Sequence, residues 1–154
     1  MELLRTAFAH LPQNWLSLLY TTFLAEIADA LGRDGKAVEG LSIIDEALAR
    51  SERNEERWCV AELLRIKGEL ILRQGAPHAA TAAEEHFLRS LDWARRQGAL
   101  SWELRTSTSL ARLQHQQGRI QKARELLTPV YGRFTEGFQT SDLMAAKGLL
   151  DQLV

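Results

Sequence analysis

The sequence predicts an all-α protein, and three observations support this fold class. The 154 residues are 45% hydrophobic and 25% charged, which is typical of one soluble globular domain. The chain holds 26 Leu and 20 Ala but only 6 Ile and 4 Val, so residues that lose little entropy in a helix outnumber those that suit strands. Only 3 prolines interrupt it. No strand and no second domain is expected.

Helix breakers and capping residues place a series of helices along the chain. The first spans 2–9 and ends before Pro12, because the residue preceding a proline is pushed out of helical geometry. Asn14 is expected to cap the second helix. Ser141 is expected to cap the last helix, with Asp142 in its first turn. The helices after the first are predicted at 15–33, 36–52, 55–74, 78–97, 100–117, 119–136 and 141–153. The connections are short, so consecutive helices should be antiparallel neighbours.

A unit of about 40 residues recurs in the sequence, which is the signature of a repeat architecture. Each copy has a small residue in a first helix, a turn glycine, and a small, bulky, small stripe on a second helix. The copies are Ala28, Gly35, Gly40, Ile44 and Ala47; Gly68, Gly75, Ala83, Phe87 and Ser90; and Ala111, Gly118, Ala123, Leu127 and Val130. Small residues let paired helices approach closely, and a glycine can adopt the left-handed conformation that ends a helix. The pattern therefore predicts three helical hairpins with these stripe residues between the paired helices.

These hairpins resemble the tetratricopeptide repeat (TPR), in a version longer than usual. Three segments further resemble the C-terminal helical repeats of large bacterial signalling ATPases, in which a cyclase-like or winged-helix domain precedes a STAND-type nucleotide-binding module. The segments run from Glu56 to Leu70, from Ser101 to Leu113, and from Val130 to Leu143. The resemblance implies a right-handed α-solenoid of about three TPR-like hairpins. It would have a partial leading helix at 1–13, repeats at 14–53, 54–98 and 99–138, and a capping helix at 139–154.

The resemblance also implies a function as a sensor or partner-binding tail. The phosphate-binding motif G-x-x-x-x-G-K-[ST] is absent from the sequence, and so are a cyclase carboxylate pair and a DNA-reading helix-turn-helix. No arrangement of Ser, His and Asp predicts nucleophilic catalysis. We therefore expect a non-catalytic protein that uses no cofactor.

In a stacked array of hairpins, the first helix of each hairpin lines a concave surface. Helical spacing places one stripe of polar side chains on that surface. Its members are Thr22, Glu26 and Asp29; Glu62, Arg65, Glu69 and Arg73; and Arg105, Thr108, Arg112 and His115. The arginines of this stripe are suited to binding carboxylates or phosphates through paired hydrogen bonds. The alternative interpretation is that these charges form i, i+3 and i, i+4 ion pairs on a solvated face.

Three functions remain open from the sequence. The first is a scaffold that binds a protein or peptide segment on the concave face, as the regulatory tail of a signalling or transcription-regulating ATPase. The second is a sensor that binds a small molecule in the groove. The third is a self-association module that forms a homodimer through the end helices. In this third function, the opening helix and the apolar side of the last helix would pair with another copy. The last helix has one broad apolar stripe, which is also compatible with a capping helix: Leu143, Leu149, Leu150 and Leu153.

Other classes of binding find little support in the sequence. The four histidines, His10, His78, His86 and His115, lack the spacing of a metal site. The formal charge of residues 1–64 is −5 and that of residues 65–154 is +4. The positive segment has no run of lysines that would indicate nucleic-acid binding. No apolar stretch is long enough to span a membrane, and the N-terminus lacks the order of a signal peptide.

Cys59 and the tryptophans have structural interpretations. A single cysteine can form no internal disulfide, which indicates a reducing, cytoplasmic location. Within a helical pattern, Cys59 is expected to be a small buried hydrophobe rather than a nucleophile. The four tryptophans lie near helix beginnings or between hairpins, where packing of neighbouring hairpins is favoured over stacking on a ligand. They are Trp15, Trp58, Trp93 and Trp102.

Overall fold

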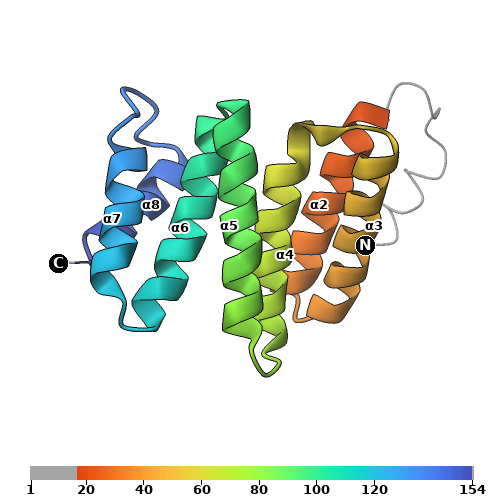
Figure 1. Cartoon of the computed structure of the whole chain (residues 1–154), viewed down its shortest axis with the longest axis horizontal. Coiled ribbons are helices and arrows are strands. Elements are labelled where there is room, and N and C mark those ends of the chain that lie inside the picture. Colours follow the sequence, from red (N-terminus) through yellow and green to blue (C-terminus); the bar gives the residue numbers. More distant parts are fainter. Residues whose placement is uncertain (1–16, 154) are drawn as a thin grey trace.

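The computed structural model describes residues 17–153, and every regular element in that range is helical (Figure 1). The elements are α2 (Ser17–Arg33), α3 (Ala37–Arg53), the 3-10 turn η1 (Arg57–Cys59), α4 (Val60–Gln74), α5 (Ala79–Gln97), α6 (Leu100–Gln116), α7 (Ile120–Tyr131) and α8 (Ser141–Leu150). The predicted all-α class is confirmed for this part of the chain. The predicted helix 2–9, the Asn14 cap and Trp15 lie outside the described residues.

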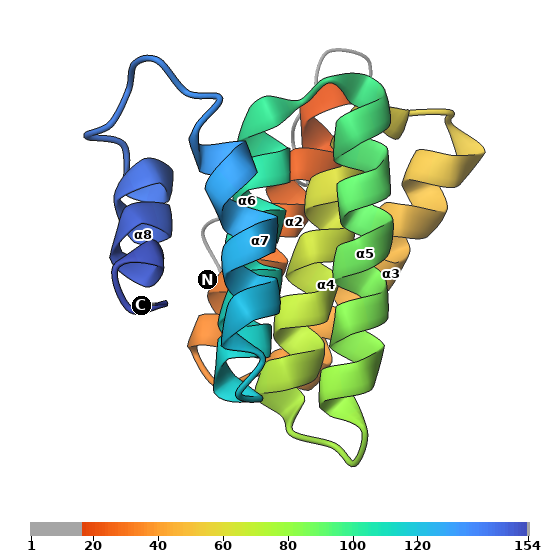
Figure 2. The same ribbon diagram turned by 60° about the vertical axis from the view of Figure 1, so that its left-hand side comes forward.

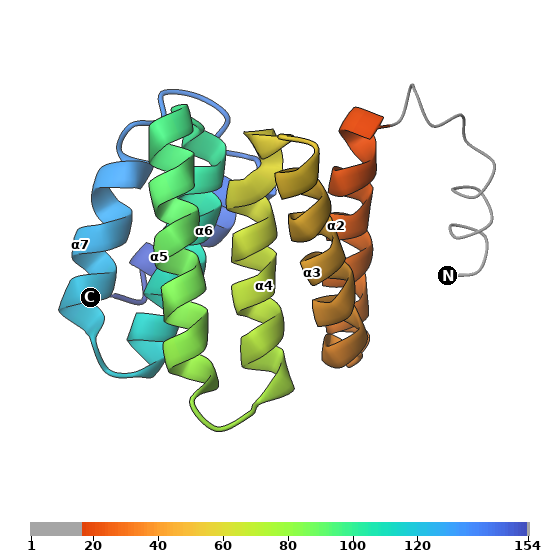
Figure 3. The same cartoon turned by 45° about the vertical axis from the view of Figure 1, so that its right-hand side comes forward.

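The helices stand side by side along the molecule, with α2 and α3 at one end, α4, α5 and α6 in the middle, and α7 and α8 at the other end (Figures 1 and 3). Each helix packs against the next, as the short connections predict. In addition, α2 packs against α4, α4 against α6, and α6 against α8. The even-numbered helices therefore form one continuous layer. Figure 2 shows α8 at the outer edge of the molecule, joined to α7 by the long loop 132–140.

The repeat pattern correctly predicted the contacts between paired helices. Every stripe residue is buried, and so is the small residue of each first helix. The helices α4 and α5 approach closely at Gly68, where an added Cβ atom would stand 2.6 Å from the Phe87 ring. The turn glycines Gly35, Gly75 and Gly118 all have positive φ angles, as expected for residues that end helices.

The apolar core runs the length of the row in three adjoining clusters. The first joins α2, α3 and α4 around Ile44 and Leu63, and the second joins α5 and α6 around Phe87. The third joins α6, α7 and α8 around Leu127. The predicted apolar stripe of the last helix belongs to this third cluster, with Leu143, Leu149 and Leu153 buried and Leu150 half-buried. Each helix is thus stabilised mainly by burying one face against its neighbours.

Some predicted helix ends are wrong. The predicted helix 55–74 is divided into η1 and α4. The predicted helix 119–136 ends at Tyr131, and beyond Gly132 the N–H groups of Arg133 and Phe134 bond to the carbonyls three residues back rather than four. The predicted helix 141–153 ends at Leu150.

The predicted Ser141 cap is also wrong. Thr140 precedes the helix, and its hydroxyl donates to the Gly137 carbonyl at 2.8 Å instead of capping α8. The loop conformation, with Gly137 at positive φ, brings that carbonyl within reach of the hydroxyl. Asp142 does lie in the first turn of α8, as predicted.

Cys59 is buried, as the sequence predicts, and burial raises the pKa of its thiol to about 11. Among residues 17–153, no helix has both the length and the apolar character needed to cross a membrane.

Candidate functional site

A cavity of about 230 Å³ opens on the layer of even-numbered helices, and all four of these helices contribute to its wall. Side chains with long polar groups dominate the lining. The lining residues are Asp29 and Arg33 of α2; Arg65, Glu69 and Arg73 of α4; Arg105, Thr108, Ser109 and Arg112 of α6; and Asp142 and Ala145 of α8. We call this site the arginine cavity, because five of its lining residues are arginines.

Most of the predicted stripe residues lie at the arginine cavity. Those that line it are Asp29, Arg65, Glu69, Arg73, Arg105, Thr108 and Arg112. Glu62 lies behind the wall, where it is buried and hydrogen-bonded to two lining arginines. The structure does not place Thr22, Glu26 or His115 in the lining. Most of the residues that helical spacing selected therefore line the cavity, and the others lie outside its lining.

Four lining residues were not predicted from the sequence: Arg33, Ser109, Asp142 and Ala145. Two of these had a signal in the spacing, since Arg33 follows Asp29 by four residues and Ser109 follows Arg105 by four. Asp142 and Ala145 belong to α8, which was interpreted only as a cap. Because α8 packs against α6 in the layer of even-numbered helices, these two residues line the cavity together with those of α2, α4 and α6.

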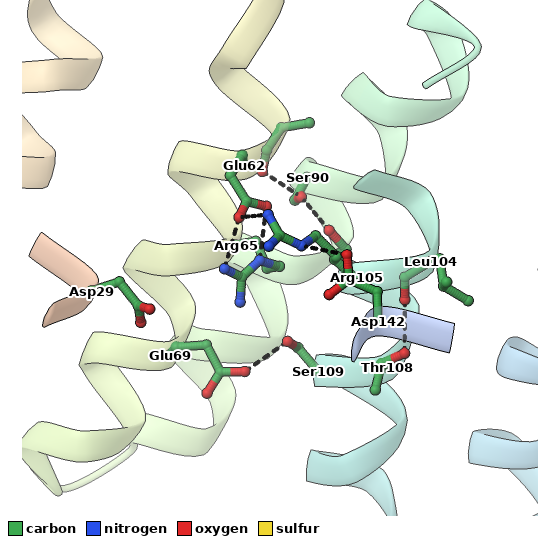
Figure 4. Close-up of polar contacts among 12 residues, drawn as sticks. Asp29, Glu62, Arg65, Glu69, Ser90, Leu104, Arg105, Thr108, Ser109 and Asp142 are labelled. Carbon is green, nitrogen blue, oxygen red and sulfur yellow. Dashed lines mark hydrogen bonds and ion pairs between the residues drawn. The ribbon is translucent and has the colours of Figure 1, made fainter. Parts of the chain in front are cut away.

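Glu62 is the centre of the upper part of the site (Figure 4). It accepts hydrogen bonds from Nε and Nη2 of Arg65, both at 2.8 Å. It also accepts one from Nη1 of Arg105 at 2.6 Å, which connects α4 to α6. Arg105 in turn pairs through Nε with Asp142 of α8 at 3.0 Å. A continuous chain of charge-assisted contacts therefore crosses three helices.

Arg65 holds its charge in a largely buried position. Burial opposes that charge, but the hydrogen bonds and negative charge of Glu62 outweigh the effect and raise the pKa of Arg65. The carboxylates of Glu69 and Asp29 act in the same direction. Figure 4 shows the Arg65 guanidinium above the space between these two acidic side chains. Arg65 is therefore a fixed positive charge in the wall of the cavity.

The lower part of the arginine cavity contains two further bridges between helices. Asp29 of α2 pairs with Arg73 of α4 at 3.1 Å and with Arg33 of its own helix at 2.9 Å. Glu69 of α4 accepts a 2.6 Å hydrogen bond from the Ser109 hydroxyl of α6. Arg112 stands 3.8 Å from the same carboxylate, which is beyond hydrogen-bond distance.

A buried polar contact holds the helices behind the cavity. The Ser90 hydroxyl of α5 donates to the Ala61 carbonyl of α4 at 2.6 Å. It also lies 2.8 Å from the Thr106 hydroxyl of α6, which must donate in this pair because Ser90 has only one proton to give. A satisfied polar contact in the core fixes the relative positions of α4, α5 and α6.

Two tryptophans, one in η1 and one in α6, pack together beside the charged contact between α4 and α6. The ring centroids of Trp58 and Trp102 lie 6.2 Å apart in a tilted arrangement. Trp102 precedes Arg105 by three residues, and Trp58 precedes Glu62 by four, so the pair lies about one turn from the Glu62–Arg105 bond. The predicted packing between neighbouring hairpins is present at these two residues.

The chemistry of the arginine cavity is that of hydrogen-bond donors. Guanidinium groups bind carboxylate and phosphate oxygens and are not deprotonated in proteins. Within residues 17–153, no group of three or more His, Cys, Asp and Glu side chains has the geometry of a metal site. The arrangement is suited to recognising an anionic group.

Comparisons with protein-family models, with curated proteins and with solved structures find no match to this chain.

Proposed function

We propose that this protein is a non-catalytic scaffold that binds a peptide or protein segment at the arginine cavity. The observation that carries the proposal is that four helices, distant in sequence, contribute polar side chains to one cavity. Function in repeat proteins resides in such composite surfaces, where each helix adds a few contacts. The charged residues that line the cavity also bridge the helices, so the binding surface is held in one shape.

The proposed architecture is a right-handed solenoid of TPR-like hairpins with the arginine cavity on its concave face. Burial of the repeated stripe residues supports this architecture, as does the packing of each even-numbered helix against the next. The sequence resemblance supports a place as the regulatory tail of a bacterial signalling or transcription-regulating ATPase, in the cytoplasm. In that setting, binding of the segment would be the signal that the tail reports.

A small-molecule sensor is the second candidate. The observation that favours it is the cavity volume of about 230 Å³, which is below the 300–1,000 Å³ typical of sites for drug-sized ligands but suits a small metabolite. Self-association is a third candidate, favoured by the exposed side chains of Met144 and Ala145 on α8. A metabolite would raise the melting temperature by mass action, whereas self-association would increase the solution mass with concentration.

The test of the proposed function is a selection from a random-peptide display library on the purified chain. Two charge reversals provide the comparison: Arg112→Glu in the cavity, and Arg124→Glu on the exposed surface of α7. Selected peptides that bind the wild type and Arg124→Glu but not Arg112→Glu would support the scaffold. A selection that enriches no peptide, or peptides that bind both variants equally, would contradict it. Equal melting temperatures of the two variants exclude a folding defect as the cause.

A further inference from the structure

The positive and negative groups of the arginine cavity are not equally accessible. The carboxylate side chains of Glu62, Glu69 and Asp29 are only 10%, 16% and 19% exposed. The side chains of Arg73, Arg105, Arg112 and Arg33 are between 33% and 63% exposed. The Asp142 carboxylate is 39% exposed but pairs with Arg105, and Arg65 is only 14% exposed. The two most exposed charged side chains of the lining are Arg33 and Arg112. This order of exposure favours an anionic ligand, although the lining contains acidic residues as well.

Several guanidinium donors of the cavity have no partner among residues 17–153. Arg105 uses Nη1 for Glu62 and Nε for Asp142, which leaves Nη2. Arg112 makes no hydrogen bond to any described residue, and its nearest carboxylate is 3.8 Å away. Each arginine has five N–H donors in a planar arrangement that fits the two oxygens of a carboxylate. Arg112 is thus the arginine most available to an incoming acidic group.

An apolar surface lies next to these donors. Trp58 is exposed, and its ring rests against the half-buried Trp102. In α6, Trp102 precedes Arg105 by three residues and Arg112 by ten. At about 5.4 Å a turn, its ring therefore lies roughly one turn from Arg105 and two to three turns from Arg112, along the same side of the helix. In an extended peptide, side chains two residues apart lie on one face at about 6.6–6.8 Å, and those four apart at about twice that distance. The two surfaces are therefore spaced to contact alternate side chains of one extended segment.

The lining of the cavity limits what enters it. Of the residues that line this space of about 230 Å³, only Ala145 is apolar, so the cavity suits an acidic side chain better than an apolar one. The apolar part of the same ligand then finds its contact outside the cavity, where Trp58 is exposed.

We infer that the partner of this protein is an extended acidic segment with an aromatic or large aliphatic residue two or four positions from its acidic residue. The acidic side chain enters the arginine cavity and binds Arg112 and the free donor of Arg105. The apolar side chain packs on Trp58. This inference rests on the proposed scaffold function and specifies the chemistry of the segment.

The test measures the binding of labelled peptides to the intact chain by fluorescence anisotropy. The peptides carry Glu and Phe two or four positions apart, and in the controls Gln replaces Glu or Ser replaces Phe. All other positions of the peptides are Gly or Ser. The Glu-to-Gln change is expected to weaken binding about tenfold, because it removes charge-assisted hydrogen bonds. The Phe-to-Ser change is expected to weaken it about fivefold through loss of aromatic contact. Higher salt is expected to weaken only the peptides that contain Glu.

Protein variants connect each peptide group to its contact. Arg112→Gln is expected to reduce the difference between the Glu and Gln peptides, because only the Arg105 donor remains, whereas Arg124→Gln on α7 keeps the full difference. Trp58→Ala is expected to bind the Phe and Ser peptides equally, whereas Trp93→Ala on α5 keeps the difference. The peptide substitutions alone test the inference with wild-type protein, so a variant that folds poorly does not prevent a result.

The possible negative results distinguish failure of this inference from failure of the scaffold function. Library-selected peptides that bind at the cavity but lack an acidic residue would overturn this inference and leave the scaffold function intact. Equal binding of the Glu and Gln peptides by the wild type would do the same. A library that yields no peptide would contradict the scaffold function and this inference together. Saturable quenching of tryptophan fluorescence by free glutarate, without binding of any peptide, would assign the anion site to a small molecule and overturn the inference.

Discussion

The carboxylate of Glu62 in α4 and the guanidinium of Arg105 in α6 form a 2.6 Å hydrogen bond across 43 positions of sequence. Because Glu62 also binds Arg65, two arginines share a single buried carboxylate. Burying a charge is costly unless it is paired and hydrogen-bonded, and Glu62 meets both conditions. This contact is therefore structural, although it forms part of the wall of the arginine cavity.

We predict that Glu62→Gln lowers the free energy of unfolding by about 2–3 kcal/mol, because it leaves two guanidinium groups without their shared carboxylate. A double-mutant cycle with Arg105→Gln should give a coupling energy of about 1 kcal/mol. Urea denaturation measures both quantities. Asp92→Asn, which breaks an exposed ion pair with Arg96, is the control and should cost less than about 1 kcal/mol. Strictly additive effects of the two cavity variants would contradict the prediction.

Two glycine substitutions should change stability in opposite directions. Gly68→Ala places a Cβ atom 2.6 Å from the fully buried Phe87 ring, so we expect a loss of about 1–3 kcal/mol from overpacking. Gly148→Ala in α8 meets no atom within 4 Å, so helix propensity should stabilise the protein by up to about 1 kcal/mol. Thermal and urea denaturation of both variants test this pair. A stabilised Gly68→Ala variant would mean that Phe87 repacks without cost.

His86 should make stability dependent on pH near neutrality. Its Nδ1 atom is buried without a partner in the described part of the chain, and burial lowers its pKa from 6.5, as do the positive charges of Lys67 and Arg89. The unfolded state therefore binds a proton more readily, so stability is retained above the ordinary histidine pKa and is lost as the pH falls through it. We expect the urea midpoint to decrease between pH about 7.5 and about 5.5.

The matched variants for this prediction are His86→Gln and His115→Gln. The first should remove the component of the pH dependence that belongs to His86, and the second should retain it. The carboxylates of Glu85 and Asp45 act in the opposite direction on His86, which limits the size of the effect. An unchanged pH profile in His86→Gln would show that His86 is not its source.

Cys59 should be unreactive in the folded protein. With a pKa of about 11, the thiol is almost entirely protonated at pH about 8, and the buried position also restricts access. We expect a disulfide reagent such as dithionitrobenzoate to react at least about a hundredfold more slowly with the native chain than with the urea-unfolded chain. Rapid labelling of the native chain would indicate local opening of the α3–α4 connection.

The helical hairpins were predictable because their signals are local. A helix shows its buried face through residues three and four apart, and Gly35, Gly75 and Gly118 mark its ends through their own backbone preferences. The end of α7 was less predictable. The residues up to 136 continue a helical pattern, but the N–H groups of Arg133 and Phe134 bond three residues back, which ends the α-helical hydrogen-bond ladder.

The candidate site was predictable only in part. The sequence indicated which stripe of each helix carries charged residues, and that stripe includes most of the cavity lining. The sequence did not indicate that α8 packs on α6 and brings Asp142 to Arg105. That contact depends on the path of the loop 132–140, whose conformation has no periodic signal.

The sequence by itself determined the all-α class, the paired helices and the residues buried between them, because helix formation and hairpin packing depend on neighbouring residues. Only the tertiary structure decided how the charges of different helices are paired. Glu62 is covered and Arg112 is exposed because of the distances between α4 and α6, and these distances result from packing of the whole row. Charge type can be identified from the sequence, but accessibility is a property of the assembled surface, and accessibility determines which ligand the cavity favours.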